Sequence, residues 1–215
     1  MKLLLHTCCA PCSVYCIDAL RKEGIEPTVY WFNPNIHPYM EYKARRDTLK
    51  EYTKSIKVEA IFEEDYGLRE FCKNVIGDLE NRCQQYCYPV RLEQTAKYAK
   101  EHGYDSFSTT LLISPYQNHE ALKLVGEQMA KKYGVNFVYR DFRVGFREGQ
   151  AKARELGLYM QKYCGCIFSE EMSSFARQKK EKEIIDRTNR DTERRIRLSE
   201  CIPSLDFRQL KRENK

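Results

Sequence analysis

Four cysteines have the spacing of a shared metal centre. Cys8 and Cys9 are adjacent and follow the apolar run at residues 3–5, which is typical of a short buried strand. Cys83 and Cys87 are four residues apart in a stretch with helical periodicity, so their sulfurs should lie on one helix face. Together the two pairs offer four thiolates, the ligand set of iron–sulfur clusters and also of structural zinc.

The spacing of these pairs favours iron–sulfur over zinc. Structural zinc usually joins two Cys-x2–4-Cys knuckles in a compact module, whereas here one pair is adjacent and more than 70 residues separate the pairs. Buried cysteines that serve only as small hydrophobic residues are the alternative. Metal binding is the better interpretation, because the pairs fall at predicted strand and helix ends rather than at core-periodic positions.

A further pair, Cys164 and Cys166, is separated by one glycine. A disulfide between them would close a strained ring and be easily reduced, so the pair suits redox chemistry or a second metal. Two inert loop cysteines are the alternative. Cys12 begins the helix predicted after Cys9, where the helix dipole favours a thiolate, and it is available to either centre.

The composition indicates one substantial domain with its own core. The chain has 215 residues and no window near the roughly 20 apolar residues of a membrane span, and it opens on a strand-like run rather than a leader. We therefore expect a cytoplasmic protein without a membrane partner, in which 10 cysteines stay reduced and bind metal or do redox work. Core packing is the simpler account of the isolated Cys16, Cys72 and Cys201.

Strand and helix signals alternate along the chain. Strands are predicted at residues 2–6, 27–33, 57–62, 104–111 and 135–142. The main helices are predicted at 12–24, at 38–55, and at 66–102 in two pieces around 77–81. Two further helices follow the last two strands and run up to residue 132 and up to residue 159. This alternation predicts an α/β fold, a Rossmann-like (HUP-like) parallel sheet flanked by helices, with a helical C-terminal extension. Because sites in such sheets lie outside the carboxyl ends of the strands, we expect "HTCC", "NPNIHP", "TTLLISPY" and "DFR" to meet there.

Positive charge is concentrated near the end of the chain. Residues 179–215 carry 12 Lys and Arg against 8 Asp and Glu, a net +4 of the total +6. We predict an α/β catalytic domain with an iron–sulfur site at residues 1–178 and a basic helical extension at 179–215. Composition leaves open whether the extension is a solvated helix or an electrostatic arm for a polyanion such as RNA.

The motifs, in their order, resemble those of the QueH family of epoxyqueuosine reductases. The resemblance runs from about residue 3 to residue 170, and the middle cysteine pair has three intervening residues where the family usually has two. It is carried by "HTCCAPCS", "NIHPYMEY", "RCQQYCYPVRLEQTA", "FSTTLLISPYQN", "DFRVGFREG" and "YCGC".

The resemblance implies an oxidoreductase of queuosine biosynthesis. Such an enzyme reduces the epoxide of epoxyqueuosine, at the wobble base of a tRNA with a GUN anticodon, to the alkene of queuosine and water. It uses an unidentified electron donor and works without cobalamin. The implied [4Fe-4S] cluster is held by Cys8, Cys9, Cys83 and Cys87. Cys164 and Cys166 are then expected to cycle between dithiol and disulfide as the two-electron store.

An additional mononuclear iron is a further expectation. An open iron would bind the epoxide oxygen and polarise the C–O bond. Asp141 lies at the predicted carboxyl end of the last strand and is the carboxylate best placed to complete such a site, with Cys12 or with Cys164 and Cys166. A helix-capping or arginine-paired carboxylate is the alternative for Asp141.

Side chains of the crevice loops are candidates for tRNA contact. Aromatic rings there suit stacking on an unpaired wobble base, and basic residues suit phosphates. His6 is either a proton donor or a hydrogen-bonded core histidine. The other candidates are His37, Tyr39, Tyr116, Asn118, Arg140, Arg143 and Arg147. With them, the basic extension is expected to contact the anticodon arm.

Two other functions fit part of the pattern. A tRNA sulfur-transfer enzyme with an iron–sulfur cluster would use ATP, but "HTCCAPCS" has no glycine where backbone amides must cradle pyrophosphate. A non-catalytic zinc-binding RNA protein would be colourless, whereas an iron–sulfur protein is brown and oxygen-sensitive.

Overall fold

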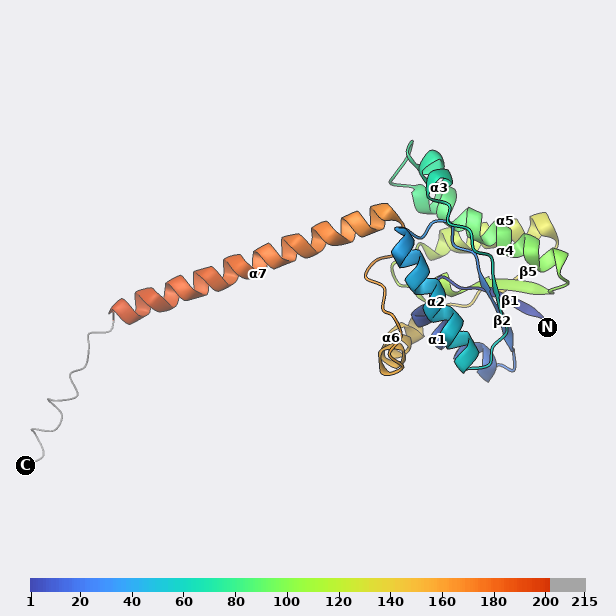
Figure 1. Ribbon diagram of the computed structural model, residues 1–215, viewed down its shortest axis with the longest axis horizontal. Coiled ribbons are helices and arrows are strands. Elements are labelled where there is room, and N and C mark those ends of the chain that lie inside the picture. Colours follow the sequence, from blue (N-terminus) through green and yellow to red (C-terminus); the bar gives the residue numbers. More distant parts are fainter. Residues whose placement is uncertain (202–215) are drawn as a thin grey trace, which may run out of the picture. The chain divides into compact units, whose positions relative to one another are not determined.

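A five-stranded parallel sheet forms the centre of the chain (Figure 1). The protein is seen in a computed structural model that describes residues 1–201, with side chains up to residue 195. Across the sheet the strands are β3 (Ala60–Phe62), β2 (Pro27–Trp31), β1 (Leu3–His6), β4 (Ser106–Thr109) and β5 (Asn136–Phe137). Every neighbouring pair is parallel, which confirms the predicted α/β sheet.

β1 is the central strand and leads directly to the first cysteines. Its four residues are all buried, and His6 lies opposite Tyr30 of β2 and Thr109 of β4. The strand order 3-2-1-4-5 is that of a doubly wound sheet, whose winding reverses between β1 and β4. Ligand sites of such folds open at the carboxyl ends of these two strands, and here that edge carries the cysteines.

Helices cover both faces of the sheet. α1, α2 and α6 lie on one face, and α4 and α5 lie on the other (Figure 1). The helices of this part are α1 (Ala10–Lys22), α2 (Tyr39–Ser55), α3 (Leu68–Val75), α4 (Tyr88–Glu101), α5 (His119–Tyr133) and α6 (Phe146–Glu155). Short helical turns are η1 (Cys83–Cys87), η2 (Thr110–Ile113) and η3 (Arg143–Gly145).

All five predicted strands are longer than the observed ones, most of all the last two. The strand predicted at 104–111 ends at Thr109, because the Thr109 hydroxyl accepts a hydrogen bond from the Leu111 amide (3.1 Å) and starts the turn η2. The strand predicted at 135–142 is reduced to β5, an edge strand with one neighbour. After the bond from the Val138 amide to the Phe107 carbonyl (2.9 Å), the chain leaves the sheet.

The predicted helices are observed with shifted ends. The prediction at 38–55 corresponds to α2, and the segment 66–102 divides around residues 77–81 as predicted, into α3 and the continuous η1 and α4. The helical stretch predicted to reach residue 159 ends earlier. α6 stops at Glu155 because Gly157 adopts the left-handed conformation (φ 66°) that closes many helices.

α6 holds α1, the helix that follows the first cysteines. The ring of Tyr15 lies on Gly145, where a Cβ atom would stand 2.1 Å from the ring carbon Cζ. At Gly149 a Cβ atom would stand 3.1 Å from Tyr15 Cβ. A Cβ atom at Gly145 would therefore clash with the Tyr15 ring, whereas one at Gly149 would only tighten the contact, and the two glycines let α1 and α6 approach closely.

α7 (Ile167–Cys201) is long and rich in charge. The chain divides into two compact units, Met1–Ser169 and Glu170–Lys215, whereas the sequence boundary was predicted after residue 178. Side chains from 175 to 195 are all exposed, and oppositely charged residues at i, i+4 spacing, such as Glu183 and Arg187, support such a helix. The last part of the predicted extension, residues 202–215, and the Cys201 side chain lie outside the described residues. None of the described helices has the length and apolarity needed to cross a bilayer.

We expect Gly145→Ala to destabilise the protein by roughly 1–3 kcal/mol, because the new methyl group overpacks the contact with Tyr15. Gly77→Ala is the matched control, since a Cβ atom there meets nothing within 4 Å. Urea unfolding midpoints under reducing conditions measure both. Equal midpoints for the two variants would show that α6 does not constrain α1 in this way.

Candidate redox and metal site

Cys8, Cys9 and Cys12 form the first thiol group. Their sulfur atoms all lie within 4.8 Å of one another, and the Cys8 and Cys9 sulfurs are 3.8 Å apart. The three residues are buried. β1 ends at His6 and α1 begins at Ala10, so the adjacent cysteines occupy a sharp turn, with Cys9 extended (φ −173°, ψ 160°) as the N-cap. This turn directs the adjacent side chains to one place.

Hydrogen bonds and burial give the three thiols of the first group different pKa values. Bonds from Cys12 and Cys9 hold the pKa of Cys8 well below its usual range. The same bond to Cys8 raises the pKa of Cys12, and burial raises the pKa of Cys9. One thiolate is therefore stabilised by two neighbouring thiols. The Cys8 amide also donates to the Thr110 hydroxyl (3.3 Å), which ties the group to the carboxyl end of β4.

His6 is a structural histidine at the base of this group. Its Nδ1 is 2.9 Å from the Thr109 hydroxyl, and its Nε2 is 3.3 Å from the Asn33 side-chain oxygen and from the Phe32 carbonyl. Burial, together with the positive charge of Arg91, lowers the pKa of His6 to about 3, so the ring is neutral near pH 7. Of the two roles predicted for His6, these contacts match the hydrogen-bonded core histidine.

Cys83 and Cys87 form the second thiol group on the turn η1, which is a π-helix. Pro89 has no amide hydrogen to donate to the Gln85 carbonyl, so the regular α-helical bonding is interrupted just before α4. The two thiols hydrogen-bond to each other. This bond, with the charges of Arg91 and Arg82, lowers the pKa of Cys83 to about 6, while the bond and burial raise the pKa of Cys87.

Arg91 is a buried cation beside both thiol groups, and the sequence analysis did not select it. Its Nε donates to the Cys87 carbonyl (2.6 Å), and its charge acts on Cys8, Cys83 and Cys164. A spacing signal was present, because Arg91 follows Cys83 and Cys87 at successive four-residue steps along one helical face. A buried guanidinium compensates negative charge on the surrounding thiolates.

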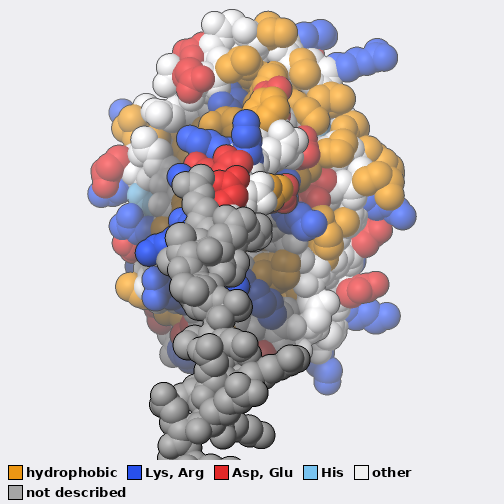
Figure 2. Space-filling model, turned by 90° about the vertical axis from the view of Figure 1, so that its left-hand side faces the viewer, with side chains coloured by type: hydrophobic (Ala, Val, Ile, Leu, Met, Phe, Trp, Pro, Cys, Tyr) orange, Lys and Arg blue, Asp and Glu red, His pale blue; other side chains and the backbone are white. Residues whose placement is uncertain are grey.

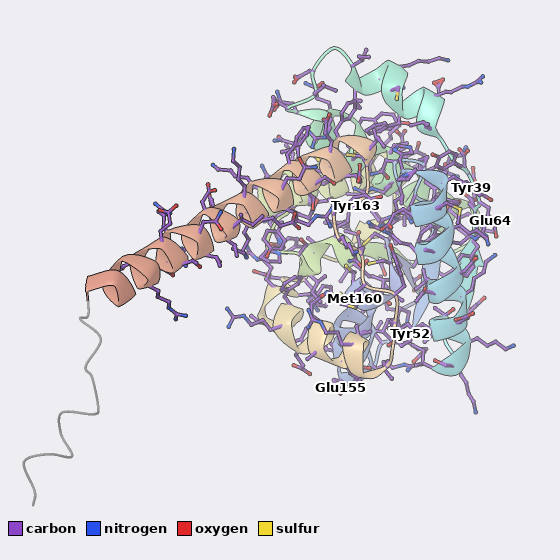
Figure 3. All side chains as sticks on the ribbon, turned by 60° about the vertical axis from the view of Figure 1, so that its left-hand side comes forward. Tyr39, Tyr52, Glu64, Glu155, Met160 and Tyr163 are labelled. Carbon is purple, nitrogen blue, oxygen red and sulfur yellow. The ribbon has the colours of Figure 1, made fainter. Side chains whose placement is uncertain are left out.

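The loop with Cys164 and Cys166 lies beside the segment that precedes α2. The Gly165 carbonyl accepts a hydrogen bond from the His37 amide (2.8 Å), and the Tyr163 hydroxyl donates to the His37 carbonyl (2.6 Å). A Cβ atom on Gly165 would stand 3.3 Å from Ile36, so glycine permits this close approach. Tyr163 lies in the segment that connects α6 to α7 (Figure 3). Both cysteines are free thiols.

Arg45 is the second buried cation missed by the sequence analysis. It forms an ion pair with Glu41 at 2.6 Å, with 1% and 8% of the two side chains exposed. Its guanidinium donates to the carbonyls of Cys164 (2.8 Å) and Tyr163 (2.9 Å), and its charge acts on Cys9. Arg45 therefore connects α2 to the Cys164 loop and reaches the first thiol group.

Packing brings the cysteine motifs together in two clusters. Cys87 and Cys166 are buried together with Phe71 and Val75 in a small apolar cluster. Cys83 packs against the main core, which contains the first thiol group. Cys83 and Cys87 are not members of the group within 4.8 Å, so a single centre on all four predicted ligands stays a prediction.

Asp141 is an exposed carboxylate whose partner is Arg143. It accepts hydrogen bonds from the Arg143 amide (3.1 Å), Nε (2.8 Å) and Nη2 (2.5 Å). The Arg143 side chain holds the pKa of Asp141 at about 2. These contacts match the arginine-paired alternative, and a role for Asp141 at the metal or in catalysis remains a prediction.

The side chains predicted to contact tRNA have different surroundings. Tyr39, at the start of α2 (Figure 3), is 49% exposed, and its ring packs on Tyr42 and Tyr66. Figure 2 shows hydrophobic side chains gathered on the upper part of one face of the molecule. Tyr116 is exposed, whereas His37 is buried, with a pKa lowered by burial to about 4.

The polar candidates serve mainly local structure. The Asn118 side chain caps α5 by accepting from the Ala121 amide (3.0 Å). Arg140 pairs with Glu23 (3.2 Å), and Arg147 is exposed on α6. Among the aromatic candidates, the exposed ring of Tyr39 is held by two other tyrosines, and its contact with tRNA stays a prediction.

Comparison with known proteins identifies a family. A family model described as epoxyqueuosine reductase QueH matches residues 3–172. A protein of that name from Dehalococcoides mccartyi is 42% identical over 169 residues, which cover 79% of this chain and 92% of that protein. One from Thermotoga maritima is 36% identical over 177 residues, covering 78% and 89%. A solved structure, a predicted subunit of tRNA methyltransferase from Methanocaldococcus jannaschii, is 13% identical with a TM-score of 0.47, covering 72% of this chain and 77% of that one.

We expect Arg45→Met to destabilise the protein by about 3–5 kcal/mol, because it leaves Glu41 buried without its cation. Replacing both residues, in Glu41→Met with Arg45→Met, should recover part of this loss. Arg21→Met is the control, since its pair with Glu26 is partly exposed and worth about 0–1 kcal/mol. Urea unfolding compares the three proteins, and a cost for Arg45→Met no larger than the control would contradict the assignment.

Proposed function

This chain belongs to the QueH family of epoxyqueuosine reductases, and on that premise we propose that it reduces the epoxide of epoxyqueuosine in tRNA to the alkene of queuosine. Membership of this family identifies the protein as an oxidoreductase of queuosine biosynthesis. The observation that carries the proposal for the site is the convergence of three cysteine motifs on Arg91, whose charge acts on Cys8, Cys83 and Cys164. Removing an epoxide oxygen takes two electrons, and thiols and their metal centres supply them.

The proposed cofactor is a [4Fe-4S] cluster on Cys8, Cys9, Cys83 and Cys87. The donor set fits such a centre, because the candidate ligands are sulfur atoms at the ends of β1 and of η1, mostly buried. Two buried guanidinium groups, Arg45 and Arg91, are in electrostatic range to offset the negative charge of thiolates. When bound, the cluster would supply electrons one at a time.

Cys12 is the proposed ligand of an additional mononuclear iron. Its sulfur lies within 4.8 Å of those of Cys8 and Cys9 and accepts a hydrogen bond from the Gln161 amide at 3.6 Å. An iron there would act as a Lewis acid on the epoxide oxygen. Asp141 would serve as a further ligand only after releasing Arg143.

Cys164 and Cys166 are the proposed two-electron store. In the overall balance, one epoxide and two thiols give one alkene, one water and one disulfide. The two thiol protons leave with the epoxide oxygen as water, and the electron pair from the thiols remains in the new carbon–carbon double bond. Cobalamin has no part in this balance.

The proposed substrate is a tRNA with a GUN anticodon that carries epoxyqueuosine. The exposed ring of Tyr39, held by Tyr42 and Tyr66, suits stacking on an unpaired base. The basic extension would add electrostatic affinity for the anticodon arm. This extension lies beyond residue 172, where the family match ends.

Turnover tests the proposal directly. We expect anaerobically purified protein to contain iron and sulfide and to convert epoxyqueuosine in tRNA to a nucleoside lighter by one oxygen, with dithionite as reductant and no cobalamin. Nucleoside mass analysis measures this conversion. A colourless protein with zinc in place of iron, or an intact cluster without loss of oxygen, would refute it.

Replacing single cysteines should separate cofactor binding from the electron store. We expect Cys83→Ala to lose most of the iron and all turnover, because it removes a cluster ligand. Cys164→Ala should keep the iron and lose turnover by roughly 100-fold or more, the scale of removing a group that reacts directly. Cys72→Ala is the control, since Cys72 belongs to neither thiol group. Iron content and tRNA turnover are measured together, and iron loss in the Cys164 variant would contradict the division of roles.

Neutralising the basic extension should weaken tRNA binding. Replacing Arg187, Arg190 and Arg194 by Gln removes three exposed cations of α7, so we expect the slope of log affinity against log salt to fall by about 2. The control replaces Glu181 and Glu183 by Gln and should not weaken binding. Filter binding from low to high salt checks this, and an unchanged slope would make α7 a solvated helix with no role in RNA binding.

A further inference from the structure

The two sulfurs of the Cys164–Cys166 pair have different surroundings. Cys164 is an exposed residue, and its sulfur accepts a hydrogen bond from the Gln117 side-chain amide at 3.4 Å. Cys166 is buried, with 4% of its surface exposed, and its sulfur is hydrogen-bonded by the Arg82 guanidinium. Cys164 is thus the member of the pair exposed at the surface, and the sulfur of Cys166 faces a cation in the interior.

The Gln117 amide is held in one orientation. The Tyr88 hydroxyl donates to the Gln117 side-chain oxygen (3.0 Å) and accepts a hydrogen bond from the Asn118 amide (3.2 Å). The Gln117 nitrogen is therefore the atom directed at Cys164. A neutral amide positions the sulfur without adding a charge beside it.

Arg82 is equally fixed, at the start of η1. One of its Nη atoms donates to the Leu79 carbonyl (2.5 Å), and its guanidinium lies 6.0 Å from the centre of the Phe168 ring. Its side chain is largely buried. A charged hydrogen-bond donor favours negative charge that develops on a departing sulfur more than a neutral donor does, so the position of Arg82 favours Cys166 as the leaving sulfur.

We propose that a dithiol electron donor regenerates the pair by attacking Cys164, while Cys166 leaves as a thiolate beside Arg82. This inference rests on the proposed function, in which the pair ends each turnover as a disulfide. It identifies the donor by its chemistry, as a protein or small molecule with two thiols. It also assigns Arg82 as a positioning residue that acts on Cys166.

The exchange proceeds in two balanced steps. A donor thiolate forms a bond to the Cys164 sulfur, the bond between Cys164 and Cys166 breaks, and Cys166 keeps the electron pair and takes a proton. The second thiol of the donor then attacks the donor sulfur that is bonded to Cys164. This closes the disulfide of the donor and releases Cys164 as a thiol. The donor is oxidised to a disulfide, and the pair gains two electrons and two protons.

Access and leaving-group stability support the same direction of attack. Attack on Cys166 would require a donor to reach a buried sulfur, and it would expel Cys164, which has a neutral amide as its hydrogen-bond donor. Attack on Cys164 requires no access to a buried sulfur, and the sulfur that it expels is the one beside Arg82. The geometry therefore gives the pair an entry side and an interior side.

Trapping with a monothiol tests which sulfur is attacked. The full-length protein is oxidised anaerobically with diamide, treated with glutathione, quenched in acid and alkylated with N-ethylmaleimide before peptide mass mapping. We expect one glutathione on Cys164 and N-ethylmaleimide on Cys166. A glutathione adduct on Cys166, or no disulfide between the two after oxidation, would overturn the proposal.

The contribution of Arg82 is measured as a rate. Reduction of the oxidised protein by dithiothreitol should slow by about tenfold in Arg82→Met, because the leaving thiolate loses a charge-assisted hydrogen bond. Arg82→Lys, which keeps the cation, should restore much of the rate and covers the case in which the Met variant does not fold. Arg154→Met, an exposed arginine of α6, is the control. Equal rates for Arg82→Met and Arg154→Met would remove Arg82 from the proposal.

A comparison of reductants separates this proposal from the proposed function. If tRNA turnover proceeds with dithionite but not with any dithiol, the dithiol route is wrong while epoxide reduction stands. If neither reductant supports loss of oxygen from the tRNA, the proposed function fails, whatever the position of the glutathione adduct.

Discussion

Two buried guanidinium groups are the constraint on which the site depends. A cation in the protein interior is costly unless it is paired and hydrogen-bonded. Arg45 meets this requirement with Glu41 and with the carbonyls of Tyr163 and Cys164, which belong to a segment far along the chain. The Cys164 loop is thus held against α2 by the need to satisfy a buried charge.

The same requirement places thiols around Arg91. Thiolates are as costly to bury as cations, and the two kinds of charge offset each other when they share one low-dielectric region. Arg91 donates to the Cys87 carbonyl and acts on Cys8 and Cys83, so one side chain serves both thiol groups. The doubly wound sheet supplies the location, because β1 and β4 end side by side at this edge.

The cysteines of the site differ in their exposure to solvent. The first thiol group is screened from solvent, which suits a centre that must hold metal and exclude side reactions. The residue Cys164, by contrast, is exposed at the surface. The proposed reaction would use both environments, one to hold the cofactor and one to admit a reductant.

The sequence by itself determined the sheet and the pairing of the cysteines within each motif. Hydrophobic periodicity is local, and so is the spacing that places Cys83 and Cys87 on one face or turns Cys8 and Cys9 together at a strand end. The strand ends were less well predicted, because a side-chain bond such as that of Thr109 competes with the ladder.

Tertiary structure decided which motifs meet and which polar residues are buried among them. Arg45 bonds to a carbonyl 119 residues away, and no local pattern distinguishes it from an exposed helical arginine. Asp141 shows the reverse case. The predicted strand end suggested a metal ligand there, but β5 ends at Phe137 and the Asp141 carboxylate pairs with its near neighbour Arg143. Local spacing fixes only the face of one element, whereas burial and charge pairing depend on how all the elements pack.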